Sequence, residues 1–325
     1  MEYTLCKIKP RGAFHIGIKE GALEKSMNYI HSDTIFGGLC NTYRLLYGRE
    51  ELEELLDKFK EKPPFLISSA FPYYEQVTFF PLPKSTNFSE YGIEDKYVKK
   101  YKKIEFVSFN IIKSLLKNEL EKHLDENNII QGKILVTAEE KEKITENIWK
   151  EKETPRVVID RKTNASNIYY FGEIEYCNKC GLYFLIRFID KGIKNRIKAS
   201  IRLLGDEGIG GDRSYGKGLF NADFEKFEWN KGNGRFIVLS LYSPKENEID
   251  MVKDGYYDII TRGGWVYSYD ERGERKKFIR MLKEGSTFEG NKEFYGKLID
   301  VTMEGRHHRI YRYGYGMPFY IGGIE

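Results

Sequence analysis

The spacing of apolar residues predicts a helix followed by a strand in the middle of the chain. Over residues 190–204, apolar side chains recur at intervals of four, four and three, which places them on one face of a helix. These side chains are Ile193, Ile197, Ile201 and Leu204. Residues 219–229, LFNADFEKFEW, alternate apolar and polar positions and so predict a strand. Residues 205–218, GDEGIGGDRSYGKG, therefore form a glycine-rich loop between the two elements.

The N-terminal pattern predicts a strand and then an amphipathic helix. Residues 3–9 alternate as a strand does. Residues 31–48, HSDTIFGGLCNTYRLLYG, place apolar side chains on one helical face and end at a glycine. Ser32 or Asp33 can cap the N-terminus of this helix by accepting a backbone hydrogen bond.

The elements up to residue 229 together indicate a ferredoxin-like order. A second helix is expected at about 49–60, followed by a β-hairpin over 65–83. Strand character resumes over 154–176, ahead of the helix and strand described above. The order β-α-β-β-α-β is that of a ferredoxin-like fold, so we expect one such domain over 1–229, with a charged, largely helical and β-hairpin insertion at about 84–165.

Residues 230–325 predict a second, more degenerate ferredoxin-like domain. It starts with a strand, RFIVLSLYS at 235–243, and continues through a helix, DERGERKKFIRMLKEG at 270–285, to further strands. The sequence KGNG at 231–234 reads as a linker. The predicted fold class is therefore α+β, with two ferredoxin-like (RRM-like) domains.

Composition narrows the functional classes. The chain has 325 residues, a net charge of +4 and 31% charged residues. No segment approaches the ~20 apolar residues of a membrane span, and the first ten residues lack the apolar stretch of a signal peptide. We therefore expect a cytoplasmic protein without a membrane partner. Lysines outnumber glutamates eight to three over 96–122, which is typical of a solvated helical insertion, with a phosphate-binding track as the alternative.

The cysteines do not indicate a metal site. Cys177 and Cys180 form CNKC at a predicted hairpin tip, which could be half of a zinc site, but the sequence has no second CxxC to complete it. Structural or inert cysteines are the preferred interpretation. We expect no metal and no cofactor.

The glycine-rich loop at 205–218 has the composition of an anion-binding turn. Because glycine lacks a Cβ atom, consecutive backbone N–H groups can approach a phosphate, and Arg213 or Lys217 can add charge-assisted hydrogen bonds. Residues 211–218 nearly match the phosphate-binding loop of nucleotide hydrolases. Gly218, however, stands where that motif needs a hydroxyl, and the helix precedes the loop instead of following it. A flexible surface loop is the alternative.

Six segments, in this order along nearly the whole chain, resemble the RAMP superfamily of CRISPR proteins, and within it the fourth subunit of type III-A Csm complexes. They are FHIG at 14–17, HSDTIFGGL at 31–39, FPLPKS at 80–85, VVIDRKT at 157–163, GIGGDRSYGKG at 208–218 and YRYGYGMPF at 311–319. The resemblance implies a non-catalytic subunit that grips the repeat-derived 5′ handle of CRISPR RNA (crRNA). It also implies that this subunit binds the large cyclase/polymerase-like first subunit and starts the filament of third, backbone subunits in antiviral defence.

The same resemblance assigns candidate RNA-binding residues. The family's first-strand histidine falls on His15, its helix-start motif begins at His31, its insertion motif contains Arg161, and its glycine loop falls on 208–218. Tyr215 departs from the family pattern, in which serine is frequent, but an aromatic ring there can stack on a base. The predicted RNA-binding residues are His15, Gly17, His31, Ser32, Arg161, Lys198, Arg202, Gly208, Gly210, Gly211, Arg213, Ser214, Tyr215 and Lys217.

The residues themselves support RNA binding less specifically. Lys194, Lys198 and Arg202 recur every four residues and form a basic stripe on the helix before the loop, although such stripes are also common on solvated helix faces. Aromatic and basic side chains together suit single-stranded RNA. Tyr311, Tyr313 and Tyr315 share one face of the last strand, where packing is preferred over RNA contact.

Two other functions stay open at this point. The chain could be an endoribonuclease that cleaves CRISPR-associated or target RNA with His15, His31 or Asp33 as general acid or base. It could also be a structural adaptor whose contacts are mainly with protein.

Overall fold

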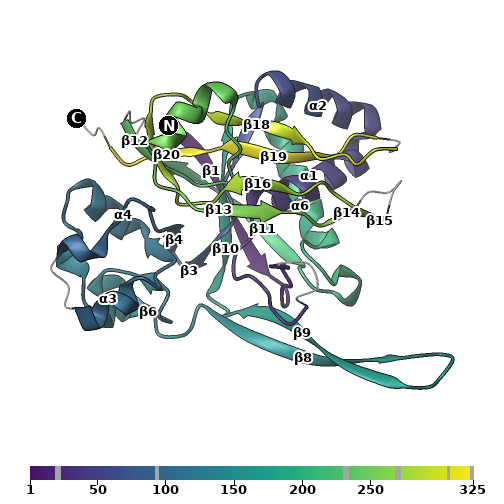
Figure 1. Cartoon of the computed structure of the whole chain (residues 1–325), viewed down its shortest axis with the longest axis horizontal. Coiled ribbons are helices and arrows are strands. Elements are labelled where there is room, and N and C mark those ends of the chain that lie inside the picture. Colours follow the sequence, from purple (N-terminus) through teal and green to yellow (C-terminus); the bar gives the residue numbers. More distant parts are fainter. Residues whose placement is uncertain (19–22, 92–94, 230–233, 268–271, 306–307, 323–325) are drawn as a thin grey trace.

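The computed structural model describes residues 1–18, 23–91, 95–229, 234–267, 272–305 and 308–322 (Figure 1). Its mixture of helices and sheets confirms the predicted α+β class. Within these residues, no helix combines the length and the apolar character that crossing a bilayer requires.

One large sheet forms the body of the N-terminal part. Its first strands are β1 (Glu2–Pro10), β2 (Phe65–Ile67), β3 (Phe71–Tyr74), β4 (Val77–Pro81), β10 (Cys180–Phe188) and β11 (Phe220–Glu228). Neighbouring strands run in the order β11-β1-β10-β3-β4, and β2 also pairs with β10. Because β1 is flanked on both sides, Cys6 lies opposite Phe184 of β10 and Phe224 of β11, and most of the strand is buried.

The helices beside these strands include α1 (Ser32–Tyr47), α2 (Arg49–Glu61) and α6 (Lys194–Glu207). Helix α6 packs on β11 and on α1, and its predicted apolar face is buried. The contact with α1 is close at Gly38, where a Cβ atom would come within 2.8 Å of Leu204 Cδ1. Along 1–229 the elements run β1, α1, α2 and β2 to β4, and after a long intervening stretch β10, α6 and β11.

Part of the insertion predicted at about 84–165 extends the main sheet. The elements in this range are α3 (Asp95–Tyr101), β5 (Phe106–Ser108), α4 (Phe109–Leu116), β6 (Ile129–Ile130), β7 (Ile134–Leu135), α5 (Ala138–Lys143) and β8 (Trp149–Ile159), and β9 (Ser166–Tyr176) follows directly after it. Strand β5 pairs with β4 and β7. Ile111 and Ile112 enter the main apolar core, whereas Lys113 and Lys117 stay exposed, as the solvated interpretation predicts.

Strands β8 and β9 form a long hairpin that projects from the body (Figure 1). Each strand has eleven residues, and the pairing is continuous from Trp149 opposite Tyr176 to Ile159 opposite Ser166. The turn beyond this last pair holds Arg161, which is exposed.

The C-terminal part consists mainly of strands. Its elements are β12 (Gly234–Val238), α7 (Ile249–Lys253), β13 (Ile259–Arg262), β14 (Trp265–Tyr267), β15 (Arg272–Arg275), β16 (Ile279–Leu282), β17 (Thr287–Gly290), β18 (Tyr295–Asp300), β19 (Tyr311–Gly316) and β20 (Pro318–Tyr320). Strand β12 lies between β17 and β20, and the pairs β13–β16, β14–β15 and β18–β19 are separate. The linker predicted at 231–234 lies outside the described residues except for Gly234, which begins β12.

The helix predicted over 270–285 is wrong for the residues that the structure describes. Arg272–Arg275 and Ile279–Leu282 are instead strands β15 and β16, which pair with β14 and β13. The helix-forming charged residues are overridden because pairing with β13 buries Met281 and Leu282 against the C-terminal core.

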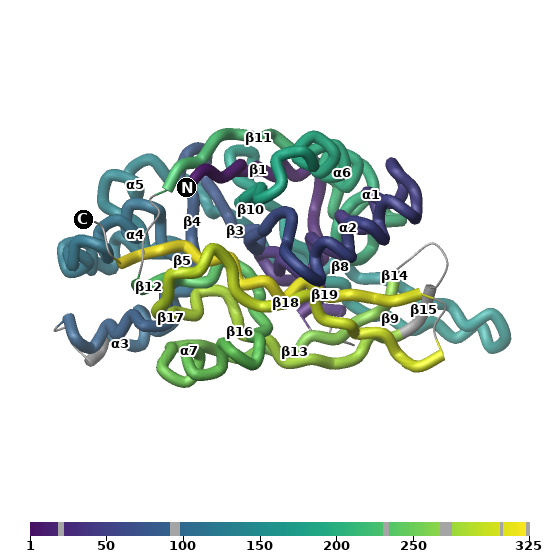
Figure 2. The backbone as a smooth tube through the Cα atoms, turned by 90° about the horizontal axis from the view of Figure 1, so that it is seen from above, coloured from purple at the N-terminus to yellow at the C-terminus, as the bar shows by residue number. Residues whose placement is uncertain are grey.

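The N- and C-terminal parts share one apolar core. Figure 2 shows β18 and β19 running alongside α1 and α2, and these elements are in contact. Tyr313 Oη accepts a hydrogen bond from the Ile67 N–H at 3.0 Å, and Tyr315 Oη donates to the Phe59 carbonyl. Both tyrosines are buried, so the preferred packing role is confirmed for them.

A disulfide joins Cys177 and Cys180 across the turn between β9 and β10. This agrees with the expected structural role. The alternative of half a zinc site is wrong, because both thiols are used in the bond.

Candidate nucleic-acid interface

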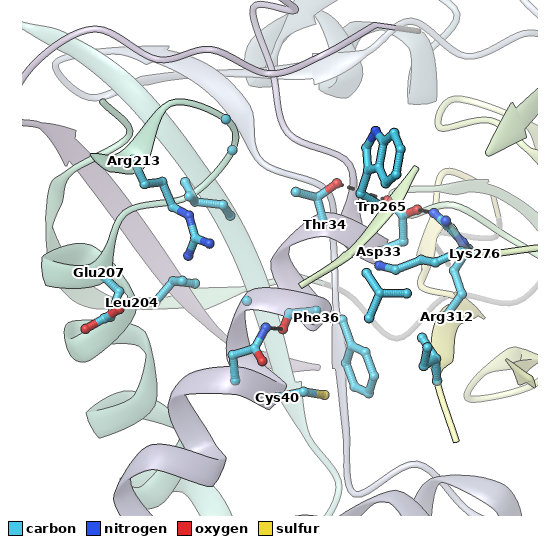
Figure 3. Close-up of a pocket in the computed structure, with 18 of the residues that line it drawn as sticks. Asp33, Thr34, Phe36, Cys40, Leu204, Glu207, Arg213, Trp265, Lys276 and Arg312 are labelled. Carbon is cyan, nitrogen blue, oxygen red and sulfur yellow. Dashed lines mark hydrogen bonds and ion pairs between the residues drawn. The ribbon is translucent and has the colours of Figure 1, made fainter. Parts of the chain in front are cut away.

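A cleft of about 1010 Å³ opens where the glycine-rich loop and α1 face the C-terminal strands. Arg213, Leu204 and Glu207 lie on one side of it, and Trp265, Asp33, Lys276 and Arg312 lie on the other (Figure 3). The sequence-predicted residues that line it are His15, Gly17, Gly208, Gly210, Gly211, Arg213 and Ser214. Residues far apart in sequence therefore meet at one site.

Close backbone approach explains why glycines recur in the loop. Gly210 has φ 93°, and a Cβ atom there would lie 2.4 Å from the His15 carbonyl oxygen. Gly218 has φ 74°, and its Cβ would lie 2.0 Å from the Ile209 carbonyl oxygen. Neither position accepts a side chain without a backbone shift, because both neighbouring atoms belong to the main chain.

The prediction that backbone N–H groups of the loop are free to bind a phosphate is wrong for most of the loop. The donors that are already used within the protein are the N–H groups of Gly208, Ile209, Gly211, Tyr215, Gly216, Lys217 and Gly218. For example, the Gly211 N–H donates to the His15 carbonyl at 2.9 Å. The loop is thus a rigid platform, and charge for an anion must come from side chains around it.

Arg156 of β8 holds the loop against the projecting hairpin. Its Nη1 donates to Asp212 Oδ1 at 3.0 Å, and its Nη2 donates to the other carboxylate oxygen. Its guanidinium also lies 4.3 Å from the centre of the Phe171 ring and 4.8 Å from that of Tyr215. Since Asp212 is in the left-handed region with φ 62°, this pairing fixes an otherwise unfavourable turn.

The loop side chains point in different directions. Arg213 reaches into the cleft (Figure 3), and Ser214 also lines it. Tyr215 is 73% exposed, and its ring packs against the Arg156 guanidinium. The Lys217 ammonium pairs at 2.7 Å with the buried carboxylate of Glu173, so an RNA-binding role for Lys217 stays a prediction.

His15 forms part of the cleft wall. Its Nδ1 donates to the Gly172 carbonyl at 2.7 Å, and its ring packs on Phe171 with the centroids 4.1 Å apart. A Cβ atom on Gly211 would lie 2.8 Å from His15 Cδ2, so the ring fits closely under the glycine loop. Gly17 lines the same wall.

The predicted N-cap of α1 is wrong, because long-range contacts use its residues. Ser32 Oγ accepts the Leu241 N–H at 3.0 Å, while the Ser32 N–H donates to Ser69 Oγ at 2.8 Å. The N-cap position is His31, which makes no side-chain cap. His31 Nδ1 hydrogen-bonds Glu284 Oε1 at 2.7 Å, and both His31 and Ser32 are buried beneath the cleft.

Asp33 is held between two arginines of the C-terminal part. Arg262 Nε and Nη2 each donate to its carboxylate at 3.0 Å, and Arg312 Nη1 donates to it as well. Burial opposes ionisation of Asp33, but the charges of Arg262 and Arg312 outweigh it and hold the pKa of Asp33 well below its ordinary value. Asp33 is therefore a carboxylate at neutral pH and is fully engaged.

The cleft as a whole is basic and partly aromatic. Its charged lining consists of Arg44, Arg213, Arg262, Lys276, Arg309 and Arg312 against Asp33, Glu207 and Asp212. Trp265 lies in the same wall and is 55% exposed. Excess positive charge beside an accessible aromatic ring suits a polyanion with stackable bases, which is the chemistry of single-stranded nucleic acid.

Besides His31, Ser32, Tyr215 and Lys217, three more predicted residues do not line the cleft. Lys198 and Arg202 extend over the Phe224 ring of β11, at 4.9 and 5.2 Å from its centroid. Arg161 is at the hairpin turn. The basic stripe of α6 thus covers the outer side of β11 and does not extend the cleft.

The C-terminal wall was missed by sequence reasoning. Arg262 and Trp265 flank the pair Gly263–Gly264, and this alternation of glycine with charged and aromatic residues was a usable signal. Arg312 lies inside the motif YRYGYGMPF at 311–319. Lys276 was not predicted as a site residue, because the segment that contains it was predicted to be a helix.

Family models match most of the chain. Residues 9–221 match the RAMP superfamily, and residues 231–321 match the CRISPR Csm4 C-terminal domain. Two similar curated proteins are both described as "CRISPR system Cms protein Csm4". The one from Methanocaldococcus jannaschii is 30% identical over 94% of this chain and 89% of its own length. The one from Thermococcus onnurineus is 29% identical over 90% of this chain and 91% of its own.

Solved structures share the fold. A chain from the Csm3–Csm4 subcomplex of the type III-A CRISPR-Cas interference complex matches with a TM-score of 0.69 and 24% identity, covering 98% of each chain. A chain from the Csm1–Csm4 cassette in complex with pppApA matches with a TM-score of 0.63 and 21% identity, covering 100% of this chain and 98% of the other.

Proposed function

This chain belongs to the RAMP superfamily of CRISPR proteins, in the Csm4 family of type III CRISPR–Cas subunits, and from that premise we propose that it holds the 5′ handle of crRNA in the cleft described above. In this role it is a non-catalytic RNA-binding subunit of a type III-A Csm interference complex. It bridges the large cyclase/polymerase-like subunit to the backbone subunits, in antiviral defence and in the cytoplasm.

The main support for the proposal is that two walls, built from distant parts of the chain, face each other across one basic cleft. The glycine-rich loop brings Arg213 and His15 to one side, and the C-terminal strands bring Arg312 and Trp265 to the other. A single RNA strand presents phosphates and bases alternately, so it can use both the cations and the exposed indole. The core of a protein–protein interface is usually depleted of charged residues, so this concentration of cations fits RNA better than a folded protein surface.

The proposed partners follow from the structural neighbours. Those chains were crystallised with Csm3 in one case and with Csm1 in the other. We expect this chain to bind the corresponding third and first subunits of its own complex. A purely structural adaptor would make the same protein contacts, but it would not need the basic cleft.

Three contacts support a binding role over a ribonuclease. Asp33 is engaged by two guanidiniums and is a weak proton acceptor, because its pKa is held low. His31 is 1% exposed and hydrogen-bonded to Glu284. His15 lines the cleft, but its Nδ1 is committed to the Gly172 carbonyl.

We also propose that 1–229 and 230–325 are two ferredoxin-like units. The strand order β11-β1-β10-β3 around α1 and α6 supports this for the first unit. In the second, β12 and β20 pair beside the single short helix α7 within the described residues, which fits a more degenerate copy.

Substitution of Arg213 tests the proposal. Affinity for an RNA that carries the repeat-derived handle is measured by fluorescence anisotropy over a series of salt concentrations, with a handle-free RNA of the same length beside it. Arg213→Ala is expected to weaken handle binding roughly tenfold, because one charge-assisted contact is lost. Arg202→Ala removes the same charge outside the cleft and is the matched control, with an expected change below about twofold.

Two results would overturn the proposed site. If wild type binds both RNAs equally, handle recognition is wrong. If Arg202→Ala weakens binding as much as Arg213→Ala, the RNA follows the outer face of α6 instead of the cleft. Cleavage of either RNA that Asp33→Ala or His31→Ala abolishes would favour the ribonuclease.

A further inference from the structure

One wall of the cleft carries more positive charge than the protein neutralises. Arg262, Lys276 and Arg312 come together around the carboxylate of Asp33 (Figure 3 labels the lysine, Arg312 and Asp33). The arginine side chains are 13% and 5% exposed, and that of Asp33 is 1% exposed. Asp33 is the carboxylate that the two arginines bind directly, and the buried carboxylate of Glu284 also acts on Arg262, so three cations face two carboxylates and the cluster keeps a net positive charge.

Asp33 has no capacity left for the lysine. Both of its oxygens accept from Arg262, and one also accepts from Arg312. Among the residues that the structure describes, the Lys276 ammonium has no hydrogen bond and no ion pair. Arg312 Nε is buried without a hydrogen-bond partner in the described part of the chain, whereas Lys276 is half-buried. Buried polar groups are normally paired, so Arg312 Nε indicates a missing acceptor, and the Lys276 ammonium beside it can contact the same acceptor.

The electrostatics agree with this geometry. Burial, followed by the charges of Arg312 and Arg262, lowers the pKa of Lys276 to about 8, and Asp33 only partly opposes the shift. An anion beside the ammonium would reverse the effect, since an opposite charge favours the protonated form.

A nucleotide fits this place better than a simple carboxylate. An ammonium next to guanidinium groups matches the several oxygens of a phosphate. The exposed Trp265 ring lies in the same wall and offers a surface on which the attached base can stack. The glycine loop with Arg213 lies across the cleft, where the strand continues.

We propose that Lys276, together with Arg262 and Arg312, forms a phosphate subsite that binds one phosphodiester of the RNA strand in the cleft. This inference rests on the proposed function, because the strand that supplies the phosphate is the crRNA handle. Asp33 is then a positioning residue that holds the two guanidiniums open toward the phosphate.

Replacing the lysine with an uncharged residue tests the subsite. Lys276→Gln is expected to weaken handle-RNA binding roughly tenfold and to reduce the slope of log affinity against log salt concentration by about 0.7, the value for one phosphate of a single strand. Lys253→Gln is the matched control, because this exposed lysine at the end of α7 loses the same charge outside the cleft. Its affinity is expected to stay within about twofold of wild type.

The pH dependence gives a readout that a purely structural role would not change. The charged and titratable groups facing Lys276 are Asp33 and Cys40 of α1, Arg262 of β13 and Arg312 of β19. The pKa of Asp33 lies far below 8, burial raises that of Cys40 to about 12, and the guanidiniums stay charged. Wild-type affinity should therefore fall between pH 7 and 9 as Lys276 loses its proton, whereas Lys276→Arg should keep its affinity over that range.

The outcomes separate this inference from the proposed function. If wild type does not prefer handle RNA, both are wrong. If wild type prefers handle RNA but Lys276→Gln keeps the wild-type affinity and salt slope, only the subsite is wrong. A fall in affinity between pH 7 and 9 that persists in Lys276→Arg would also overturn the subsite.

Discussion

At the scale of single residues, Asp33 is where the N- and C-terminal parts of the cleft meet. It starts α1, yet it acts as the counter-ion of two arginines that lie more than two hundred residues away. An aspartate near a helix start is commonly interpreted as a cap. Here the same carboxylate is buried and organises a basic wall, so its main contribution is to tertiary structure.

Asp33→Asn tests this role. Removing one partner of a buried ion pair leaves the guanidiniums uncompensated, so the free energy of unfolding at pH 7 should fall by about 3 kcal/mol. Urea titration followed by circular dichroism measures the change. Asp254→Asn, at an exposed aspartate after α7, is the control and should change little.

The pH dependence of the same variant has a defined sign. A carboxyl group whose pKa is lowered by folding stabilises the protein above its unfolded pKa, near 4, and this contribution is lost as the pH falls toward the lowered value. The stability difference between wild type and Asp33→Asn should therefore shrink below about pH 4. A difference that is absent at pH 7, or that grows in acid, contradicts the role given to Asp33.

At the scale of elements, the glycine-rich loop acts as a shaped platform for the cleft. Gly210→Ala and Gly216→Ala distinguish the effect of the loop's shape from the effect of its backbone flexibility. Both residues have positive φ, so both changes strain the backbone, but the two added Cβ atoms meet different surroundings. A Cβ on Gly216 meets nothing within 4 Å, so this change should cost about 1 kcal/mol of stability and leave RNA affinity unchanged. A Cβ on Gly210 would meet the His15 carbonyl, so the His15 wall must shift.

We expect Gly210→Ala to lose more stability than Gly216→Ala and to weaken handle binding several-fold. Chemical denaturation and anisotropy on the two purified variants measure both effects. Equal RNA affinities for the two variants would mean that the shape of the loop does not matter for binding.

Helices α1 and α6 were predictable from sequence, whereas the C-terminal strands were only partly so. The apolar periodicity of α6 is strong because that helix buries one face on α1 and β11. The segment 270–285 is rich in helix-forming charged residues, and its strands exist because of pairing with β13 and β14. Local propensity could not reveal that pairing. The same limit applies to Ser32, which bonds to Leu241 instead of capping its own helix.

At the scale of the whole molecule, the cleft exists because distant parts of the chain pack together. The apolar core includes Leu239, Tyr313 and Phe319 together with N-terminal residues, and buried contacts such as that of His31 with Glu284 cross the same boundary. One wall of the candidate site could be predicted, since its motifs are local. The other wall could not be assembled from sequence, because Arg262 and Trp265 share one segment while Lys276 and Arg312 come from two others, and only tertiary packing aligns the three segments.

Photo-cross-linking of a handle RNA with 4-thiouridine at successive positions, followed by mass spectrometry of the full-length protein in its assembled complex, tests the central claim most directly. The account predicts that handle positions cross-link to both walls of the cleft, namely the loop at 205–218 and the C-terminal residues around Trp265 and Lys276. Cross-links confined to the outer face of α6, at Lys198 and Arg202, or to the hairpin turn at Arg161, with none in the cleft, would contradict it.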